Sequence, residues 1–442
     1  MRTLVCSMVF IAVLALRVSG QASEKDRWLE DFDLAATRFE KNFAQLLHTR
    51  GVETTQPGRS WVAAHLCPLL GYYPPGAAGL IFYFHEAGTL KIWVLDDNGV
   101  EGFARREISV EELVGLEAML KDSLFVESLQ ASRAPRRRGE APVLRRTAVP
   151  RDLEESIRIA TEVLLPPAVG RAISTKRHLI VVHVLNIGTI PFAILKPFGD
   201  GTFLVDRMSL SIAPSLSDVT VSLDRNAARF HESRRAAFTF DNPLIVGNPL
   251  FPQESEWALP QLPGAELEAR SVAQAVGGGG PLVGGSATES RVLSGIGDAD
   301  FLYFATHGVA SAIEPLDRSF LAFASGDGKS GFLTAREIQQ TKLRADIAVL
   351  SACQTGLGNV HDAGIIGLSR AFQLAGVPHV VMSLWNVYDD ATRELMELFI
   401  GELKAGGDFF PAGALQAAMR RLREKRQDPA EWACFVVFGI PY

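Results

Sequence analysis

Cysteine is scarce in this chain, with four in 442 residues. Cys6 lies in an apolar N-terminal stretch, which leaves Cys67, Cys353 and Cys434 in the rest of the sequence. Three is an odd and sparse set, so a disulfide framework is excluded and one thiol at least has no disulfide partner. No Cys-x-x-Cys pair and no His/Cys cluster has metal-ligand spacing. The sequence therefore predicts neither a metal nor another cofactor.

An excess of basic residues is also missing, because 44 lysines and arginines stand against 50 acidic residues. A net charge of −6 excludes nucleic acid as the main partner, since nucleic-acid binding needs a concentrated basic face. The exception is local, at residues 133–146, which hold six arginines against one glutamate. Together with Pro135, Gly139 and Pro142, they predict an exposed loop or a cleavable linker at residues 132–150. A plain solvated basic loop is the alternative.

No hydrophobic run is long enough to span a bilayer, which takes about 20 residues. The longest, at residues 4–16, follows Arg2 and stops at Arg17, with small residues up to Ala22. This pattern predicts a signal peptide at residues 1–22, and its cleavage would send the chain to the periplasm or outside the cell. A short buried helix and an uncleaved anchor are the alternatives. No stable membrane span is predicted elsewhere.

No repeat of 30 to 45 residues is visible, which argues against a helical-repeat array. Apolar residues make up 47% of the chain, enough for a large core. Residues 24–50 have helical apolar spacing, and a short helix is expected at residues 61–70. Residues 23–79 are therefore predicted to form a helical N-terminal segment.

A hairpin is predicted next, from aromatic and β-branched runs at residues 80–84 and 90–95. Helices are expected at residues 110–129 and 152–165, on either side of the basic loop. These elements make up the first part of the main domain, residues 80–177.

From residue 178 onward, short buried strands alternate with helices, which indicates a mostly parallel sheet in an α/β layer fold. Strands are predicted at residues 179–184, 244–246, 301–305, 320–323, 347–350 and 379–384. Helices are predicted at residues 265–275, 289–293, 335–339, 365–375, 391–405, 413–425 and 429–438.

Two of these strands end in reactive side chains. Phe-Leu-Tyr-Phe-Ala is followed by Thr306, His307 and Gly308, and Cys353 stands three residues after Ile-Ala-Val-Leu. Parallel sheets place ligands beyond the carboxyl ends of their strands, so we expect both ends to lie side by side. An imidazole can take the proton of a thiol, and the amides of Gly308 and Cys353 can hold an oxyanion. A small core cysteine and a polar loop histidine are the alternatives.

Many short segments of the sequence resemble those of one family, and they follow one another in the order typical of that family. From residue 80 to the C-terminus the chain is similar to a CHAT domain, the caspase-like peptidase domain related to separase among the clan CD cysteine peptidases. The segments are HLIVVHVLNIGTIPFAIL, SIAPSLS, LIVGNP, LPGAELEA, SATES, FLYFATHG, EPLDRSFLAF, GFLTAREI, ADIAVLSACQTGLG, IIGLSRAFQLAGVPHVVMSLWNVYDDAT and WACFVVFG. Helical repeats often precede the domain in this family, and none is evident here.

The resemblance implies a caspase-like three-layer α/β/α fold with a mostly parallel central sheet, spanning residues 80–442, with its catalytic part at residues 178–442. It implies that Cys353 is the nucleophile and His307 the general base of a cysteine endopeptidase. Such an enzyme hydrolyses peptide bonds in proteins or peptides through an acyl-enzyme.

Acidic residues near the expected mouth of the site favour a basic residue before the cut, by charge complementarity. Asp362, Asp389 and Asp390 are the main candidates, with Glu314 and Asp317 nearby. Asp390 also suits a helix N-cap. Trp385 would line the pocket or pack in the core, and Arg370 is expected to form a structural ion pair.

Two readings compete with a constitutive peptidase. The first is a scaffold or interaction module that keeps the fold without turnover. The second is a latent enzyme that is activated by a regulatory protein partner or by cleavage in the basic loop.

Overall fold

The computed structural model describes residues 23–49, 63–124, 136–137, 152–223, 238–253, 257–311, 314–351, 353–354, 363–385 and 389–442. The predicted signal peptide, most of the basic loop and the loop after Cys353 lie outside these residues. Within the described residues, eleven strands form the central sheet, beside a four-stranded and a two-stranded sheet.

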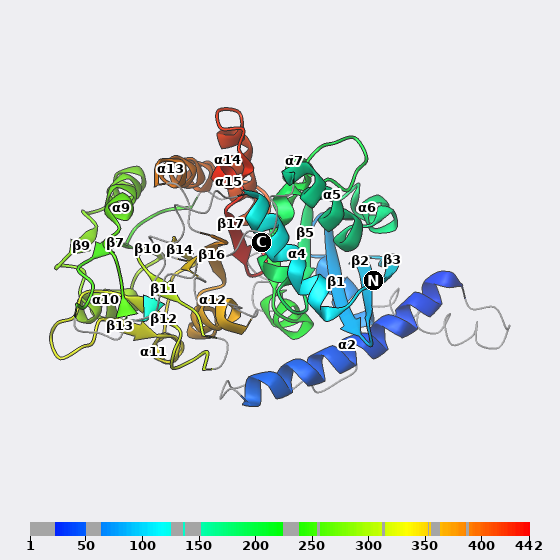
Figure 1. The fold of residues 1–442 in the computed structure, drawn as a ribbon, viewed down its shortest axis with the longest axis horizontal. Coiled ribbons are helices and arrows are strands. Elements are labelled where there is room, and N and C mark those ends of the chain that lie inside the picture. Colours follow the sequence, from blue (N-terminus) through cyan, green and yellow to red (C-terminus); the bar gives the residue numbers. More distant parts are fainter. Residues whose placement is uncertain are drawn as a thin grey trace.

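The central sheet runs from β3 to β9 across the molecule (Figure 1). In spatial order its strands are β3 (Gly99–Glu107), β2 (Thr89–Asp96), β1 (Ala78–Glu86), β5 (His178–Val182), β6 (Ser209–Ala213), β17 (Phe435–Phe438), β16 (His379–Ser383), β14 (Ile347–Leu350), β10 (Phe301–Ala305), β7 (Pro243–Pro249) and β9 (Leu282–Gly284).

Most neighbours in this sheet are parallel; only β1–β2, β2–β3 and β16–β17 are antiparallel. Because β17 opposes β16, the sheet contains two parallel blocks that point in opposite directions, and β2 and β3 form an antiparallel extension beside β1. We call them the β5 block (β1, β5, β6 and β17) and the β10 block (β16, β14, β10, β7 and β9). The prediction of a mostly parallel sheet is confirmed, and the carboxyl ends of β10 and β14 lie at one edge.

Helices cover both faces of the sheet and give three layers (Figure 1). On the β10 block, one side carries α9 (Pro263–Val276), α13 (Asp389–Ala405) and α15 (Pro429–Trp432), and the other carries α10 (Glu289–Ile296), α11 (Ala335–Gln340) and α12 (Ala363–Ala375). The helix α14 (Ala412–Arg423) packs on β6 and β17 of the β5 block and also contacts α13. On the β5 block the helices are α2 (Glu24–Thr49), α3 (Ala63–Leu70), α4 (Val110–Leu124), α5 (Leu153–Leu164), α6 (Pro167–Ile173) and α7 (Leu204–Arg207).

The alternation of side chains along β1 explains the layers. Ile81 and Tyr83 belong to one hydrophobic cluster, whereas Leu80 and Phe82 belong to a second one. Successive side chains of a strand point to opposite faces, so a strand that is apolar at every position needs cover on both sides. Burying a large apolar side chain such as Phe82 contributes about 1.5–3 kcal/mol.

The N-terminal helix α2 packs on the β5 block, along β1 to β3 (Figure 1). Phe32 meets the edge of Phe82, with ring centroids 5.6 Å apart. Lys91 of β2 binds Asp31 of the helix at 2.6 Å. The helical N-terminal segment predicted from the sequence is therefore present, and it is docked on the sheet.

One predicted helix, at residues 429–438, is wrong in its second half. The helix α15 ends at Trp432, and residues 435–438 form β17, the strand that joins the two blocks. Phe-Val-Val-Phe is a β-branched and aromatic run whose residues are all buried, and such runs favour a strand between two other strands. The predicted hairpin is confirmed, and β3 extends it to three strands.

A small sheet lies beyond the carboxyl ends of β10 and β14. Its strands, in order, are β13 (Phe332–Thr334), β12 (Phe320–Ala322), β11 (Gly308–Val309) and β15 (Cys353–Gln354). The two-stranded sheet pairs β4 (Arg136–Arg137) with β8 (Trp257–Ala258).

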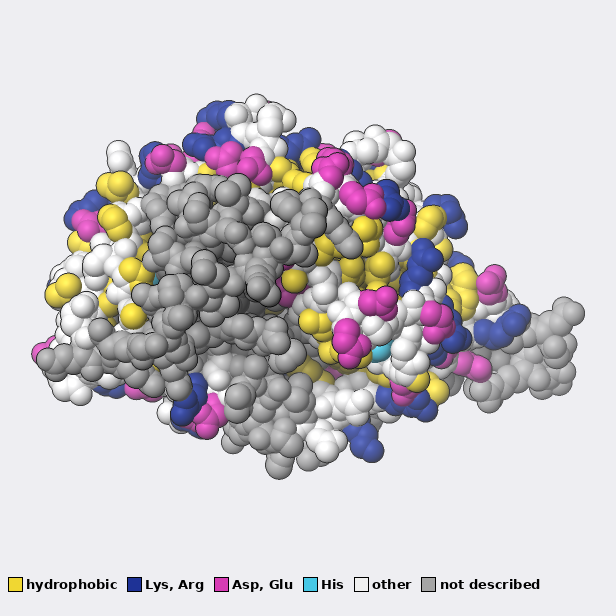
Figure 2. Space-filling model, viewed as in Figure 1, with side chains coloured by type: hydrophobic (Ala, Val, Ile, Leu, Met, Phe, Trp, Pro, Cys, Tyr) yellow, Lys and Arg dark blue, Asp and Glu magenta, His cyan; other side chains and the backbone are white. Residues whose placement is uncertain are grey.

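Basic and acidic side chains are interspersed on the face shown in Figure 2. In the described part of the chain, no helix is both long enough and apolar enough to cross a membrane.

Candidate active site

The two strand ends singled out in the sequence are neighbours. β10 and β14 are parallel, with Phe304 opposite Leu350. One step further, β11 and β15 are also parallel, with Gly308 opposite Cys353. The expectation that these ends lie side by side is thus confirmed for the backbone. The side chain of Cys353 lies outside what the structure describes.

His307 is held from two sides. The residue is 2% exposed, and its ring packs against Phe251, with ring centroids 4.8 Å apart. Its Nε2 lies 2.8 Å from the carbonyl oxygen of Pro260. A carbonyl only accepts hydrogen bonds, so Nε2 carries the proton and Nδ1 keeps the lone pair of the neutral ring. This tautomer leaves Nδ1 as the atom that can act as a base.

Burial also sets the charge of this imidazole. Desolvation lowers the pKa of His307 to about 4, and the hydrogen bond to Pro260 opposes this only in part. The ring is therefore neutral at neutral pH. A neutral ring favours proton removal from a thiol during reaction over a preformed thiolate–imidazolium pair.

The loop that supplies the Pro260 carbonyl is pinned by the end of β7. The side-chain oxygen of Asn248 accepts the N–H of Leu262 at 2.7 Å, and Asn248 itself has a positive φ of 43°. At Gly247, a Cβ would lie 2.4 Å from the Cβ of Ala269, so helix α9 needs a glycine there. The Gly-Asn-Pro segment of the sequence thus serves to place the histidine's partner.

A buried polar network lies beneath the two strand ends. Tyr303 of β10 donates its hydroxyl hydrogen to the carboxylate of Glu268 on α9, and Ser351 also hydrogen-bonds to Tyr303. Burial raises the pKa of Tyr303, so it stays protonated. Ser351 stands two residues before Cys353, so this network anchors the end of β14. Nothing in the sequence links Tyr303, Glu268 or Pro260 to the two strand ends, because only the fold brings Pro260 to His307 and Glu268 to Tyr303.

The predicted substrate-binding carboxylates are only partly described. Asp390 is 79% exposed and lies 3.5 Å from Arg393, one helical turn away. Because α13 begins at Asp389, Asp390 lies in its first turn and is not the residue that precedes the helix. Asp362 and the side chain of Asp389 lie outside the described residues, and a role in binding stays a prediction for all three.

Other candidates have structural partners. Glu314 pairs with Arg318, and Asp317 pairs with Arg336 at 2.5 Å. Trp385 is buried and donates its indole N–H to the Ala430 carbonyl at 3.1 Å, which fits the packing alternative.

Arg370 forms the expected structural ion pair, 2.6 Å from Asp218. It lies on α12, which follows the loop after Cys353, and its guanidinium is buried. The pair ties this helix to the segment after β6.

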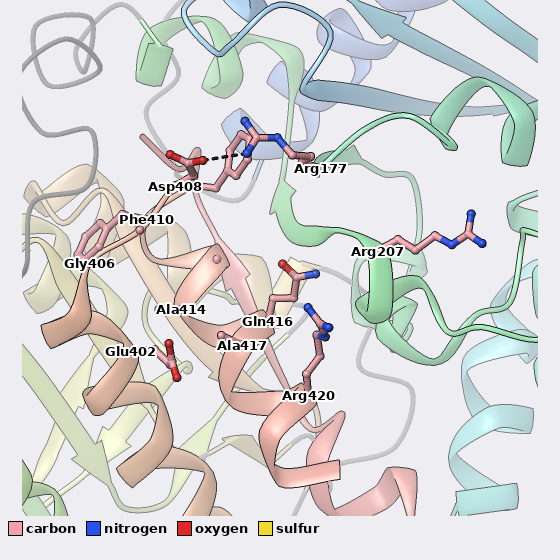
Figure 3. Close-up of a pocket in the computed structure, with 13 residues that line it drawn as sticks. Arg177, Arg207, Glu402, Gly406, Asp408, Phe410, Ala414, Gln416, Ala417 and Arg420 are labelled. Carbon is pink, nitrogen blue, oxygen red and sulfur yellow. Dashed lines mark hydrogen bonds and ion pairs between the residues drawn. The ribbon is translucent and has the colours of Figure 1, made fainter. Parts of the chain in front are cut away.

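A cavity of about 310 Å³ lies in another part of the molecule, and Figure 3 shows the residues that line it. Arg177 and Asp408 form an ion pair at 2.9 Å across it, and the end of α13 and the start of α14 line it. The helix α13 begins beyond the carboxyl end of β16, at the edge that holds His307, and its 17 residues extend for about 25 Å. The cavity lies at the far end of α13, so it does not hold a substrate of the His307 site.

Within the described ranges, no group of three or more histidine, cysteine, aspartate and glutamate side chains could hold a metal ion.

Two curated relatives share part of this sequence. The human protein named tetratricopeptide repeat protein 28 is 28% identical over 303 residues, and its mouse counterpart is 26% identical over 300. Each alignment covers 60% of this chain and 12% of the relative. The chain therefore spans a small part of the length of these relatives.

A solved structure shares the fold. A chain in the 2.6 Å crystal structure of the Saccharomyces cerevisiae separase–securin complex aligns with a TM-score of 0.50 and 12% identity, over 96% of this chain and 34% of that one. The likeness supports the caspase-like three-layer fold that the sequence implied.

The CHAT domain family matches residues 154–440, which is more than half of the chain. The strands β1 to β3 precede that match but belong to the same sheet, so a domain start at residue 80 stays a prediction. With the fold and the order of its motifs in agreement, this chain belongs to the CHAT domain family.

Proposed function

We propose that this protein is a cysteine endopeptidase with Cys353 as nucleophile and His307 as general base. The observation that carries the proposal is the pairing of Gly308 with Cys353, directly after a neutral histidine whose Nε2 is held by a carbonyl. Fold and family alone would fit a silent module equally well.

The chemistry follows from the orientation of the imidazole. Nδ1 of His307 takes the proton of the Cys353 thiol as the sulfur attacks the peptide carbonyl carbon, and the amides of Gly308 and Cys353 receive the oxyanion. The imidazolium then gives this proton to the leaving amine, and an acyl-enzyme remains. Water, activated by the same nitrogen, hydrolyses the thioester and restores the thiol.

We further propose that the substrate is an extended protein or peptide segment with arginine or lysine before the cut. Asp362, Asp389 and Asp390 are the residues expected to receive that side chain, by charge complementarity.

Labelling with a peptidyl-arginine acyloxymethyl ketone tests the proposal directly. The expected result is one adduct, mapped to Cys353 by mass spectrometry, together with cleavage of arginine and lysine peptides that Cys353→Ala abolishes. An aspartyl analogue of the reagent is the matched control for the basic preference. Folded, reduced protein that leaves such peptides uncut and Cys353 unlabelled would contradict the peptidase assignment.

A second candidate is a latent or silent module, activated by a regulatory partner or by cleavage in the basic loop. The deep burial of His307 under Phe251 favours it, because a peptide must reach Nδ1 before any turnover. Intact-mass analysis over time, compared between wild type and Cys353→Ala, distinguishes self-processing from processing by another protease.

We also propose that the chain is exported after removal of residues 1–22. N-terminal sequencing of protein expressed from its full reading frame checks this, and a mature N-terminus near residue 23 is expected.

A further inference from the structure

A strand from the arginine-rich region lies close to the candidate active site. In β4, Arg137 is opposite Trp257 and Arg136 is opposite Ala258 of β8, in antiparallel register. Ala258 stands two residues before Pro260, whose carbonyl holds His307 at 2.8 Å. In Figure 1, β4 is the short cyan arrow beside the small sheet that contains β11.

The strand β8 is fixed on its inner side. Trp257 is buried and meets Phe320 of β12 edge-on, with ring centroids 5.5 Å apart. Phe320 pairs with Val309 of β11, the strand that also contains Gly308. This packing fixes β8 beside the candidate active site, and β4 takes up backbone hydrogen bonding along β8.

The edge of a strand offers N–H and C=O groups that an extended peptide can pair with, and many proteins bind peptides in this way. Here the paired residues are both arginines, from a stretch with six arginines and one glutamate. The two arginines of β4 are thus the same residue type that we expect in a substrate with basic residues.

We propose that β4 is a built-in occupant of the β8 edge, which competes there with extended, arginine-rich peptides. The inference rests on the proposed function in one respect, that peptides bound at this edge are the ones presented to Cys353. The strand pairing itself does not depend on turnover.

The occupant is suited to reversible displacement. Two residues make few ladder bonds, but their covalent attachment gives them an effective concentration of about millimolar. A peptide that needs the same edge can bind only the molecules in which the edge is open. Its apparent affinity is therefore the intrinsic affinity multiplied by the fraction of open molecules.

The test measures binding in Cys353→Ala protein, where no turnover occurs. The probe is a fluorescent peptide with the sequence of residues 133–141, RAPRRRGEA, followed by fluorescence anisotropy. Arg136→Pro/Arg137→Pro removes both backbone N–H groups of β4, and we expect the probe to bind about tenfold more tightly. Arg136→Gln/Arg137→Gln keeps the backbone and is the charge control, with a smaller gain expected. Equal affinity in the parent and the proline variant, or an equal gain in both variants, overturns the proposal.

If the proline variant does not fold, a disulfide that holds β4 on β8 provides the converse experiment. Directly opposed residues of antiparallel strands have Cβ atoms about 4.5–5.5 Å apart, near the reach of a disulfide. In the same Cys353→Ala background, Arg136→Cys/Ala258→Cys should form a disulfide on oxidation. The disulfide should weaken probe binding about tenfold, and reduction should restore the affinity. Cys67 and Cys434 are buried and compete little for the new thiols. A pair that never cross-links, or a disulfide without effect on affinity, overturns the proposal.

Failure of the proposed function is recognised separately. If Cys353-containing protein cuts no peptide while the affinity shifts hold, the occupant stands and the peptidase assignment falls. If peptides are cut but the β4 variants bind the probe with unchanged affinity, the peptidase assignment stands and the proposal that β4 occupies the edge falls.

Discussion

Two buried histidines, one in each block of the sheet, show what separates a structural imidazole from a candidate catalytic one. His178 starts β5 and uses both ring nitrogens, with Nδ1 2.8 Å from Ser209 Oγ and Nε2 3.1 Å from Ser211 Oγ. His307 follows β10, and among the described residues its ring makes one hydrogen bond, from Nε2 to Pro260. Both side chains are buried, so their hydrogen bonds distinguish them. Within the described part of the chain, only His307 of the two keeps a ring nitrogen, Nδ1, without a hydrogen bond.

Exchanging the two histidines for asparagine should give the largest contrast. His307→Asn removes the base, and we expect peptide cleavage or Cys353 labelling to fall by roughly 10²–10⁴-fold, the usual contribution of a general base. His178→Asn should keep the rate of labelling but lower the free energy of unfolding by about 1–3 kcal/mol, because buried serine hydroxyls lose partners. Peptide kinetics and urea unfolding of both variants check this. Equal loss of activity in both would remove the distinction.

The pH profile sharpens the same comparison. Burial lowers the pKa of His307 to about 4, so the acid limb of kcat/KM should lie well below the ordinary imidazole value of about 6.5. His178 touches no predicted catalytic group, so its substitution should leave that limb in place. A limb at 6.5 or above in the wild type would contradict a buried neutral base.

Stability should depend on pH through both rings. Burial lowers the pKa of His178 to about 3, so each folded histidine binds fewer protons than the unfolded chain below about pH 6.5. The free energy of unfolding should therefore decrease as pH falls through 6.5 toward 4. Thermal unfolding between pH 7 and 4.5 should show a smaller decrease in Tm for His178→Asn than for wild type; an unchanged slope would contradict the assignment.

Two buried tyrosines offer the most specific test, with the smallest expected effect. Tyr303 bonds to Glu268 and Ser351 beneath the candidate site, whereas Tyr83 donates to the Leu164 carbonyl at 2.8 Å in the β5 block. Each substitution by phenylalanine should cost about 1 kcal/mol of stability. Only Tyr303→Phe should also slow Cys353 alkylation, by a few-fold, since it loosens the end of β14. A similar rate in both variants would assign Tyr303 a purely structural role.

The sequence predicted the parts of this protein that depend on local pattern. Continuous apolar runs identified β10 and β14, and their shared reactive ends predicted that His307 and Cys353 are neighbours. The carbonyl of Pro260 could not be predicted, since nothing in the residue type indicates which nitrogen of a distant ring it will hold. The local pattern predicts helix at residues 435–438, whereas the strand partners that decide the structure there, β16 and β6, lie far away in the sequence.

The position of β17 has a consequence for how the chain folds. It is the last described strand in sequence order, yet it lies in the middle of the central sheet, between β6 and β16. Each block can gather its own strands as they are synthesised, but the two blocks share a continuous sheet only once β17 inserts between them. Such a late, long-range contact is slow to form and leaves unpaired strand edges in the meantime. We therefore expect the His307 edge of the β10 block to form before the whole sheet is complete.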